Sequence, residues 1–197
     1  MAGIAIIGLG NPGVRYQNTR HNCGFWLIDE LALQKGVAFQ KKTNFRAETA
    51  SFSHNDKTCL LIKPMTYMNE SGKFLQKLLF DVNCFSDSSI LIHDDVAISL
   101  GELKISKTKS AGGHNGVMSV IGAIGSSIIR LRIGIGGKPR CFQTMSEFVL
   151  STFSPPERAL LAERKAHFLS ALLKIVDEGV DCAMNHYNQS LKRKPLQ

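Results

Sequence analysis

The sequence predicts an α/β fold: a single-domain, three-layer sandwich in which a mixed, largely parallel twisted sheet is flanked by helices. Apolar, β-branched runs alternate with amphipathic segments along the chain, as expected when strands alternate with helices. The 197 residues, 44% of them hydrophobic, allow one domain with a substantial core. No repeat, low-complexity stretch or linker divides the chain. We therefore expect one α/β domain over residues 1–188, followed by a basic C-terminal tail over residues 189–197.

Strands are expected where apolar or alternating residues lie between polar segments. Four apolar runs read as buried strands in chain order, namely IAIIGL, TCLLIK, SILIHD and IRLRIGIG. In two further segments, RAETASFSH and ELKIS, apolar and polar residues alternate, as they do in strands with one exposed face.

Helices are expected where apolar residues recur at helical spacing. This periodicity predicts helices over residues 22–35, 70–82 and 115–124, and a long C-terminal helix from about residue 155. The last helix has the strongest start signal, because SPPE at 154–157 combines an N-cap serine, a proline at the first helical position and a glutamate three residues on. Gly179 is expected to stop or kink this helix.

The first apolar run leads into GLGNPG, which has the G-x-G-x-x-G spelling of a dinucleotide-binding loop. The context disagrees with that interpretation, since the next amphipathic pattern begins only around Cys23. The segment where a ribose-binding acid is expected, VAFQKK, ends in lysines. We therefore expect a strand followed by a loop that presents Asn11, Arg20, His21 and Asn22.

The charge balance favours contact with a polyanion. Lysine and arginine number 24 against 16 acids, which gives a formal charge of +8 and a pI of about 9.4. The basic residues cluster around GGHNG, with Lys104, Lys107 and Lys109 before it and Arg130 and Arg132 after it. A solvated surface is the plainer explanation of such a run.

Targeting and cysteine signals are weak. The five cysteines are scattered without a C-x-x-C pair, so they indicate neither a disulfide framework nor a thiolate zinc site. No stretch approaches the roughly 20 apolar residues of a membrane span, and the N-terminus does not resemble a signal peptide. We expect a soluble, cytoplasmic protein with no membrane partner.

Four polar segments follow predicted strands or precede a predicted helix: NPGVRYQNTRHN, PMTYMNESG, HDD and AGGHNG. Ligands of open α/β sheets bind at the carboxyl ends of strands, so these loops are expected to share one rim. No G-x-S-x-G elbow, P-loop or H-E-x-x-H motif is present.

Water-mediated acid–base chemistry fits the residues of these loops best, with a histidine as base, a carboxylate to orient it and amides to bind the substrate. A metal site built from His21, His93, Asp94 and His114 stays open, although no spacing specifies one. Asn69 and Asn115 are equally candidates for plain helix N-caps.

Five stretches resemble the bacterial-type peptidyl-tRNA hydrolase family in order, spacing and wording: GLGNPGVRYQNTRHNCG, KPMTYMNESG, ILIHDDVAISLGELKI, SAGGHNG and RLRIGIGG. The segment FVLSTFSPPE is similar to a later part of the family. The resemblance implies a catalytic domain that hydrolyses the ester between a peptide and the 3′-terminal ribose of tRNA, recycling the tRNA. It implies that the chain binds the acceptor end of peptidyl-tRNA. We further expect a monomer that needs no metal or other cofactor.

Matching positions carry the family's roles onto this sequence. His21 would be the catalytic base, Asp94 its orienting partner and Asn11 a further catalytic group. Substrate binding would fall to Tyr16, Met68, Asn69 and Asn115, and tRNA binding to Arg132, Lys104 and Lys107.

Two departures affect the expected tRNA surface. Members of the family often carry a basic residue where Ser106 stands and a glycine where Lys109 stands, so the cationic surface before GGHNG is rearranged. Two alternatives stay open: a catalytically idle RNA-binding relative, like some plant organellar splicing factors of this fold, and a hydrolase for another ester or amide.

Overall fold

A computed structural model of the chain describes residues 3–83, 89–107, 110–137 and 143–189. Seven strands form one sheet in the order β2-β3-β4-β1-β5-β7-β6. The neighbours β4, β1, β5 and β7 are parallel, while β2, β3 and β6 pair antiparallel at the two sides. The strands are β1 Ile4–Gly8, β2 Gln40–Lys42, β3 Ala47–His54, β4 Lys57–Pro64, β5 Ser89–Asp95, β6 Leu103–Ser106 and β7 Ile129–Gly134.

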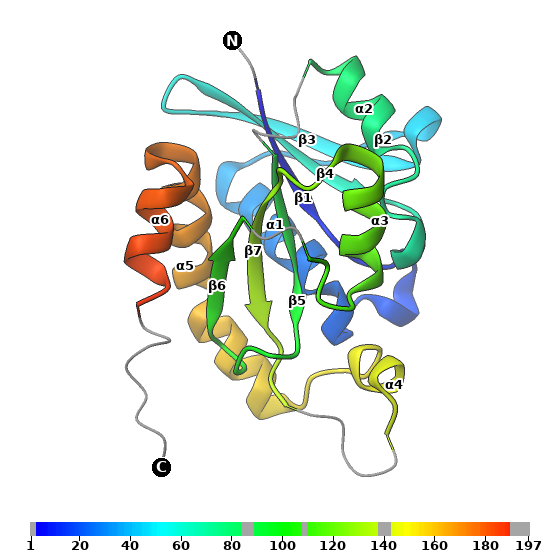
Figure 1. Ribbon diagram of the computed structural model, residues 1–197, viewed down its shortest axis with the longest axis vertical. Coiled ribbons are helices and arrows are strands. Elements are labelled where there is room, and N and C mark those ends of the chain that lie inside the picture. The colour runs from blue at the N-terminus through cyan, green and yellow to red at the C-terminus, as the bar shows by residue number, and fades with distance from the viewer. Residues whose placement is uncertain (1–2, 84–88, 108–109, 138–142, 190–197) are drawn as a thin grey trace.

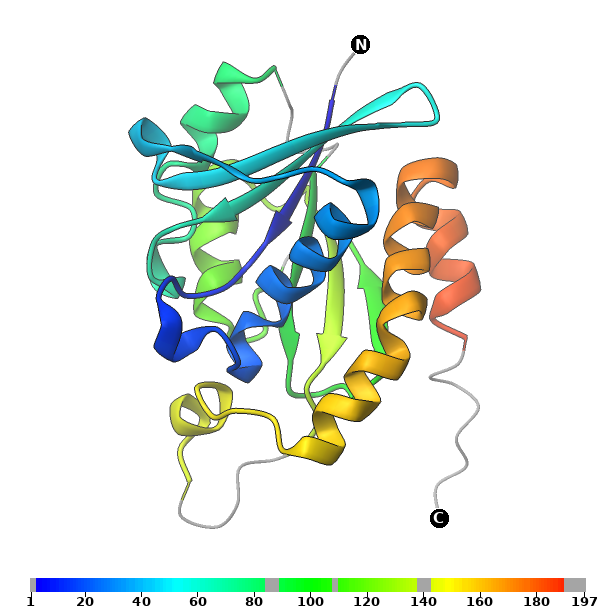
Figure 2. The same cartoon turned by 180° about the vertical axis from the view of Figure 1, so that it is seen from behind.

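Helices cover both faces of the sheet, so the predicted three-layer α/β sandwich is confirmed (Figures 1 and 2). The helices α1 Cys23–Lys35, α5 Pro155–Glu178 and α6 Val180–Tyr187 lie on one face. The helices α2 Leu75–Asp81 and α3 Asn115–Ile124 lie on the other. A short helix, α4 Met145–Val149, lies beyond the carboxyl ends of β5 and β7 (Figure 1).

The core has two parts, one on each face, as alternation along the central strands requires. Ile6 and Ile92 point toward α1 and α5, where they pack with residues such as Leu27 and Phe168. Ile7 points the other way, toward α2 and α3. Each fully buried side chain of this kind contributes about 1.5–3 kcal/mol.

A close approach of α1 to the sheet fixes the segment that follows β1. A Cβ atom on Gly24 would lie 2.5 Å from the backbone oxygen of Ile92 and from the backbone nitrogen of Leu9, so only glycine fits there. The GLGNPG stretch leads into two 3₁₀ turns, η1 Val14–Tyr16 and η2 Arg20–Asn22, and α1 begins only after them. This arrangement agrees with a loop that presents side chains rather than with a dinucleotide-binding helix.

Most sequence-predicted elements are confirmed, and one boundary is wrong. Residues 70–82 do not form one helix: a 3₁₀ turn, η4 Met68–Glu70, precedes the shorter α2. Gly72 explains the difference, because its backbone N–H donates to Oγ of Ser119 at 3.0 Å and no room is left for a Cβ atom. The expected capping box joins Ser154 to Glu157, and α5 ends at Glu178 with Gly179 as its C-cap.

The strand β2 and the helix α4 were not expected, being only three and five residues long. The expected basic tail, residues 189–197, lies outside the described residues except for Gln189. In the described part of the chain, no helix has both the length and the apolar character to cross a bilayer.

Candidate active site

A groove of about 640 Å³ opens where the parallel strands end. All four polar segments singled out in the sequence contribute to it, so the expectation of one shared rim is confirmed. The helix α4 closes one side. The lining residues include Asn11, His21, Tyr67, Met68, Asn69, His93, Asp94, Asp95, His114, Asn115, Met145, Val149 and Leu150.

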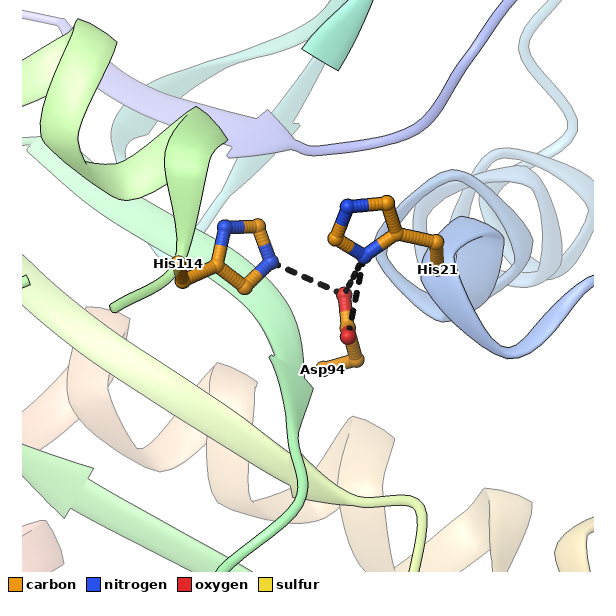
Figure 3. Close-up of side chains that lie close together, drawn as sticks. All are labelled: His21, Asp94 and His114. Carbon is orange, nitrogen blue, oxygen red and sulfur yellow. Dashed lines mark hydrogen bonds and ion pairs between the residues drawn. The ribbon is translucent and has the colours of Figure 1, made fainter. Parts of the chain in front are cut away.

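His21 and Asp94 form the central pair of this groove. His21 lies in η2, and its Nδ1 is 2.9 Å from Oδ1 and 3.0 Å from Oδ2 of Asp94 at the end of β5 (Figure 3). A carboxylate only accepts, so Nδ1 of His21 carries a proton, and in the neutral imidazole Nε2 is then the nitrogen with the lone pair. Nε2 has no partner among the described residues.

His114 holds the same carboxylate from the other side. Its Nδ1 accepts from the backbone N–H groups of Gly116 and Val117, at 3.1 and 3.3 Å, which makes it the N-cap of α3. The proton must therefore sit on Nε2, which donates to Oδ1 of Asp94 at 2.9 Å. One carboxylate thus accepts from two imidazoles (Figure 3).

Asp94 is ionised in this setting. Burial alone would raise the pKa of Asp94, but hydrogen bonds and charge interactions with His114 and His21 lower it far below the usual aspartate value. An ionised Asp94 stabilises a positive charge that develops on His21 when the imidazole takes up a proton.

His93 lies behind this group and stays neutral. Burial, followed by the neighbouring His114, lowers the pKa of His93 to about 3. Its Nδ1 donates to the backbone oxygen of Asp94 at 2.7 Å, and its ring meets that of His114 edge-on at 4.9 Å. His93 therefore packs beneath the catalytic candidates and holds the backbone at the end of β5.

The backbone N–H and C=O groups of Asn11 are both held by hydrogen bonds. Asn22 accepts from the N–H of Asn11 and donates to its C=O, each at 2.9 Å. Oδ1 of Asn11 accepts from the backbone N–H of Met68 at 2.8 Å. The Nδ2 group of Asn11 is thereby left as a donor in the wall of the groove.

Asn69 and Asn115 also line the groove, but neither is a helix N-cap. Tyr67 occupies that position for η4, and His114 occupies it for α3, so the N-cap interpretation is wrong for both asparagines. Both side chains are exposed at the groove surface, where they can bind a substrate. Met68 is buried and also lines the groove.

Tyr16 does not line the groove but contacts a residue that does. Its ring meets the ring of Tyr67 edge-on with centroids 6.5 Å apart, and Tyr67 lines the groove. Tyr16 therefore stands beside the entrance rather than in contact with the reacting centre.

The basic candidates lie at the β6 side of the sheet. Arg132 donates through Nε to Oδ2 of Asp95 at 2.7 Å, which ties it to the groove wall. Lys104 pairs with Arg132 in the β6–β7 register, so the two side chains share a face of the sheet. Lys107 follows the end of β6 and forms an exposed ion pair with Asp181 at 2.8 Å. Lys109 lies outside the described residues.

Sequence reasoning missed the double role of His114 and the contribution of α4. Histidine is not among the preferred N-cap residues, so its position before GVMSVIGAI gave no signal for that role. The exposed side chains of Met145 and Leu150 give the groove an apolar border. The signal for α4 was the capping box between Thr144 and Glu147.

The atoms of His21, Asp94 and His114 lie close enough together to be considered as metal ligands, since all fall within 4.8 Å of one another. In this arrangement both imidazoles donate to the carboxylate, and a metal ion would have to replace those hydrogen bonds. The expectation of a metal-free site stays a prediction.

Comparisons with known proteins identify the family to which the chain is similar. A family model described as peptidyl-tRNA hydrolase matches residues 5–195. The peptidyl-tRNA hydrolase of Thermodesulfovibrio yellowstonii is 43% identical over 189 residues, which cover 94% of this chain and 99% of the relative. That of Enterococcus faecalis is 42% identical over 164 residues, covering 82% and 86%.

Solved structures show the same fold. The crystal structure of peptidyl-tRNA hydrolase from Acinetobacter baumannii superimposes with a TM-score of 0.87 at 32% sequence identity, covering 94% of each chain. The sequence match spans nearly the whole chain, and the matched region contains every residue of the groove. The chain therefore belongs to the peptidyl-tRNA hydrolase family.

Proposed function

We propose that His21 activates a water molecule to hydrolyse the ester that joins a peptide to the 3′-terminal ribose of tRNA. The observation that carries this mechanism is the pairing of Nδ1 of His21 with the buried carboxylate of Asp94. That pairing fixes the tautomer in which Nε2 is the base. The family assignment supplies the substrate.

The reaction needs no covalent intermediate in this scheme. Water loses a proton to Nε2 of His21 as its oxygen attacks the ester carbonyl, and the proton then passes to the departing ribose oxygen. Asp94 stabilises the imidazolium that exists between the two transfers. A positioned base of this kind contributes about 10²–10⁴-fold to the rate.

The amide side chains supply the polar contacts. Nδ2 of Asn11 is an oriented donor, because Oδ1 is already held by the N–H of Met68. It can stabilise the oxyanion of the tetrahedral intermediate. Asn69 and Asn115 present both donors and acceptors, which suits the N–H and C=O groups of a peptide backbone.

The basic face around β6 and β7 is proposed to hold the acceptor RNA. Arg132 and Lys104 lie opposite each other in the strand pairing. Tyr16 stands at the groove entrance, where it can contact the substrate as it enters. Lys107 can contribute as well, because an exposed ion pair such as that with Asp181 is worth little and exchanges readily for a phosphate.

We propose a cytoplasmic monomer whose catalytic domain spans residues 1–188 and whose basic tail, residues 189–197, contributes to RNA binding. The tail KRKPLQ and the net charge of +8 support this division of roles.

One assay tests the proposed function directly. Purified protein is incubated with N-acetyl-aminoacyl-tRNA and with the unblocked aminoacyl-tRNA, and release of the acyl group is followed over time. We expect the blocked substrate to be cleaved with turnover and His21→Ala to be inactive. Binding of tRNA without cleavage by the unaltered chain would favour the RNA-binding alternative.

A further inference from the structure

A second cavity lies on the side of the η2 turn that faces away from the groove. It has a volume of about 180 Å³, opens to the surface, and is bounded by residues 17–19, the start of α1 and the first turns of α5. These helices lie side by side on the same face of the sheet (Figure 2). The groove and this cavity share no lining residue.

Most of the cavity wall is apolar and is formed by the side chains of Cys23, Trp26, Phe153 and Leu161. The buried polar residues Thr19 and Asn22 complete it. Burial, together with the nearby charges of Asp94 and Asp95, raises the pKa of the Cys23 thiol, so this side chain stays neutral. A cavity of about 150 Å³ with apolar walls is known to accept benzene, so this volume suits a single aromatic ring.

The rim is polar and cationic. Arg158 donates through one nitrogen to the backbone oxygen of Phe153 at 3.1 Å, which leaves further guanidinium N–H groups for a ligand. Lys165 also lies on the rim, but it pairs with Glu30 at 2.9 Å, and the two charges offset each other. Arg158 thus leaves a net positive charge at the mouth, which favours an anionic group on the ligand.

The cavity touches the element that carries the proposed base. Its wall includes Asn22 and Cys23, the two residues that follow His21. The carboxamide of Asn22 also holds the backbone of Asn11 through two hydrogen bonds. A molecule in the cavity therefore contacts the turn that positions both His21 and Asn11.

We infer that this cavity is a second binding site that takes a single-ring aromatic carboxylate and modulates the turn carrying His21. The binding part of this inference is independent of the reaction, whereas the modulation rests on the proposed role of His21. The ring occupies the wall of Trp26, Phe153 and Leu161, and the carboxylate meets the guanidinium of Arg158. Neither group enters the groove.

The single tryptophan of the chain makes binding measurable, because Trp26 lines the cavity. Benzoate is titrated against the full-length protein while Trp26 fluorescence is recorded, with benzylamine, benzyl alcohol and inorganic phosphate as comparison probes. We expect a saturable change with benzoate and at least tenfold weaker binding of the other three. Arg158→Gln should weaken benzoate at least fivefold, while Lys174→Gln, a loss of charge at the far end of α5 where Lys174 pairs with Glu178, should leave it unchanged.

A filling variant isolates the cavity without disturbing the fold. Ala162 is exposed on α5 and borders the cavity, so Ala162→Phe should abolish the benzoate response and keep the unfolding temperature. In hydrolysis of N-acetyl-aminoacyl-tRNA, saturating benzoate should change kcat at least twofold with KM constant, and Ala162→Phe should remove the change.

The two parts of the inference fail separately. The absence of a saturable fluorescence change, equal affinity for benzylamine, or an unaltered response in Ala162→Phe would overturn the binding site. Saturable binding with kcat unmoved would overturn the modulation alone. If the protein shows no hydrolysis at all, the proposed function fails, and the fluorescence titration still decides on the site.

Discussion

Nε2 of His114 lies 2.9 Å from Oδ1 of Asp94, so the carboxylate that orients the proposed base is itself held by a second imidazole. Nδ1 of His114 caps α3 by accepting backbone N–H groups, and this contact fixes the ring. The proton of the neutral ring is therefore on Nε2, which donates. Asp94 is therefore linked through His114 to the N-terminus of α3, and directly to His21 in the groove. Substitutions at the two histidines should accordingly have different signatures.

We expect His21→Ala to lose at least about 10²-fold in kcat, the lower limit for a positioned base, while tRNA affinity and unfolding temperature stay close to those of the unaltered protein. Asp94→Asn should lose less, because it spoils the orientation of His21 and leaves the imidazole in place. Single-turnover rates and filter binding measure the two effects separately. Residual activity above a tenth in His21→Ala would place the base elsewhere, and equal losses in the two variants would show that Asp94 does more than orient.

Two substitutions separate the capping role of His114 from its hydrogen bond to Asp94. Asparagine is among the best N-cap residues, so His114→Asn keeps the cap of α3 and loses the hydrogen bond to Asp94. His114→Ala loses both. We expect the two variants to lower kcat by a similar factor, while urea unfolding shows His114→Ala to be less stable than His114→Asn by about 1 kcal/mol. A kcat that follows stability instead, high in asparagine and low in alanine, would assign His114 to the cap alone.

His93 should make stability fall with acid. Its folded-state pKa of about 3 lies below that of a free histidine, about 6.5. As pH falls from about 6.5 toward 3, the unfolded chain binds a proton that the folded chain does not, so folding stability is lost by up to about 1.4 kcal/mol per pH unit. Above pH 7 both states are neutral and the contribution vanishes.

Urea unfolding of the unaltered protein and of His93→Phe between pH 7 and 4.5 measures this contribution. Phenylalanine keeps an aromatic ring against His114 but does not titrate, so the free energy of unfolding should fall less steeply with acid in the variant. The loss of the hydrogen bond to Asp94 shifts the whole curve without changing its slope. Parallel curves would show that His93 takes up its proton in the folded protein as well.

The sequence predicted the parts of the site that depend on strand ends and missed those that depend on packing between loops. Alternation and apolar runs placed HDD at the end of β5, and topology then brought His21 and Asp94 to the same edge. The split of residues 70–82 followed from contact between Gly72 and Ser119, which are far apart in the chain. His114 can act as a cap only when its proton is on Nε2. Only its three hydrogen-bond partners in the folded protein show that the proton is there.

Chelation distinguishes water activation by His21 from activation by a metal ion. The three possible ligands, His21, Asp94 and His114, already satisfy one another by hydrogen bonds. We therefore expect full turnover after exhaustive dialysis against EDTA, and no stimulation by Zn²⁺, Mn²⁺ or Mg²⁺ beyond effects on the tRNA itself. A short acylated RNA fragment serves as the control, because it lacks the folded tRNA that Mg²⁺ stabilises. Loss of its cleavage on chelation, with recovery on adding one divalent ion, would show a metal mechanism.

The salt dependence of tRNA affinity identifies which cations contact phosphates. The slope of log K against log salt is negative, and each phosphate contact makes it steeper by about 0.9 for a duplex and by about 0.7 for a single strand. Arg132→Ala, Lys104→Ala and Lys107→Ala should each flatten the slope and raise KM more than they lower kcat. Lys41→Ala and Lys42→Ala are matched controls, because both lysines are exposed on β2, at the opposite side of the sheet from β6.

Arg132 needs one more control, because its removal also frees Asp95 in the groove wall. Cleavage of a short acylated fragment isolates the reacting centre from the RNA surface, so it should be nearly unchanged in Arg132→Ala if the arginine acts on phosphates. A fragment that is cleaved as poorly as full-length tRNA would instead assign Arg132 to positioning Asp95. Identical salt slopes in the three variants and the two β2 controls would remove this face from the RNA interface, because a phosphate contact cannot be lost without releasing fewer counterions.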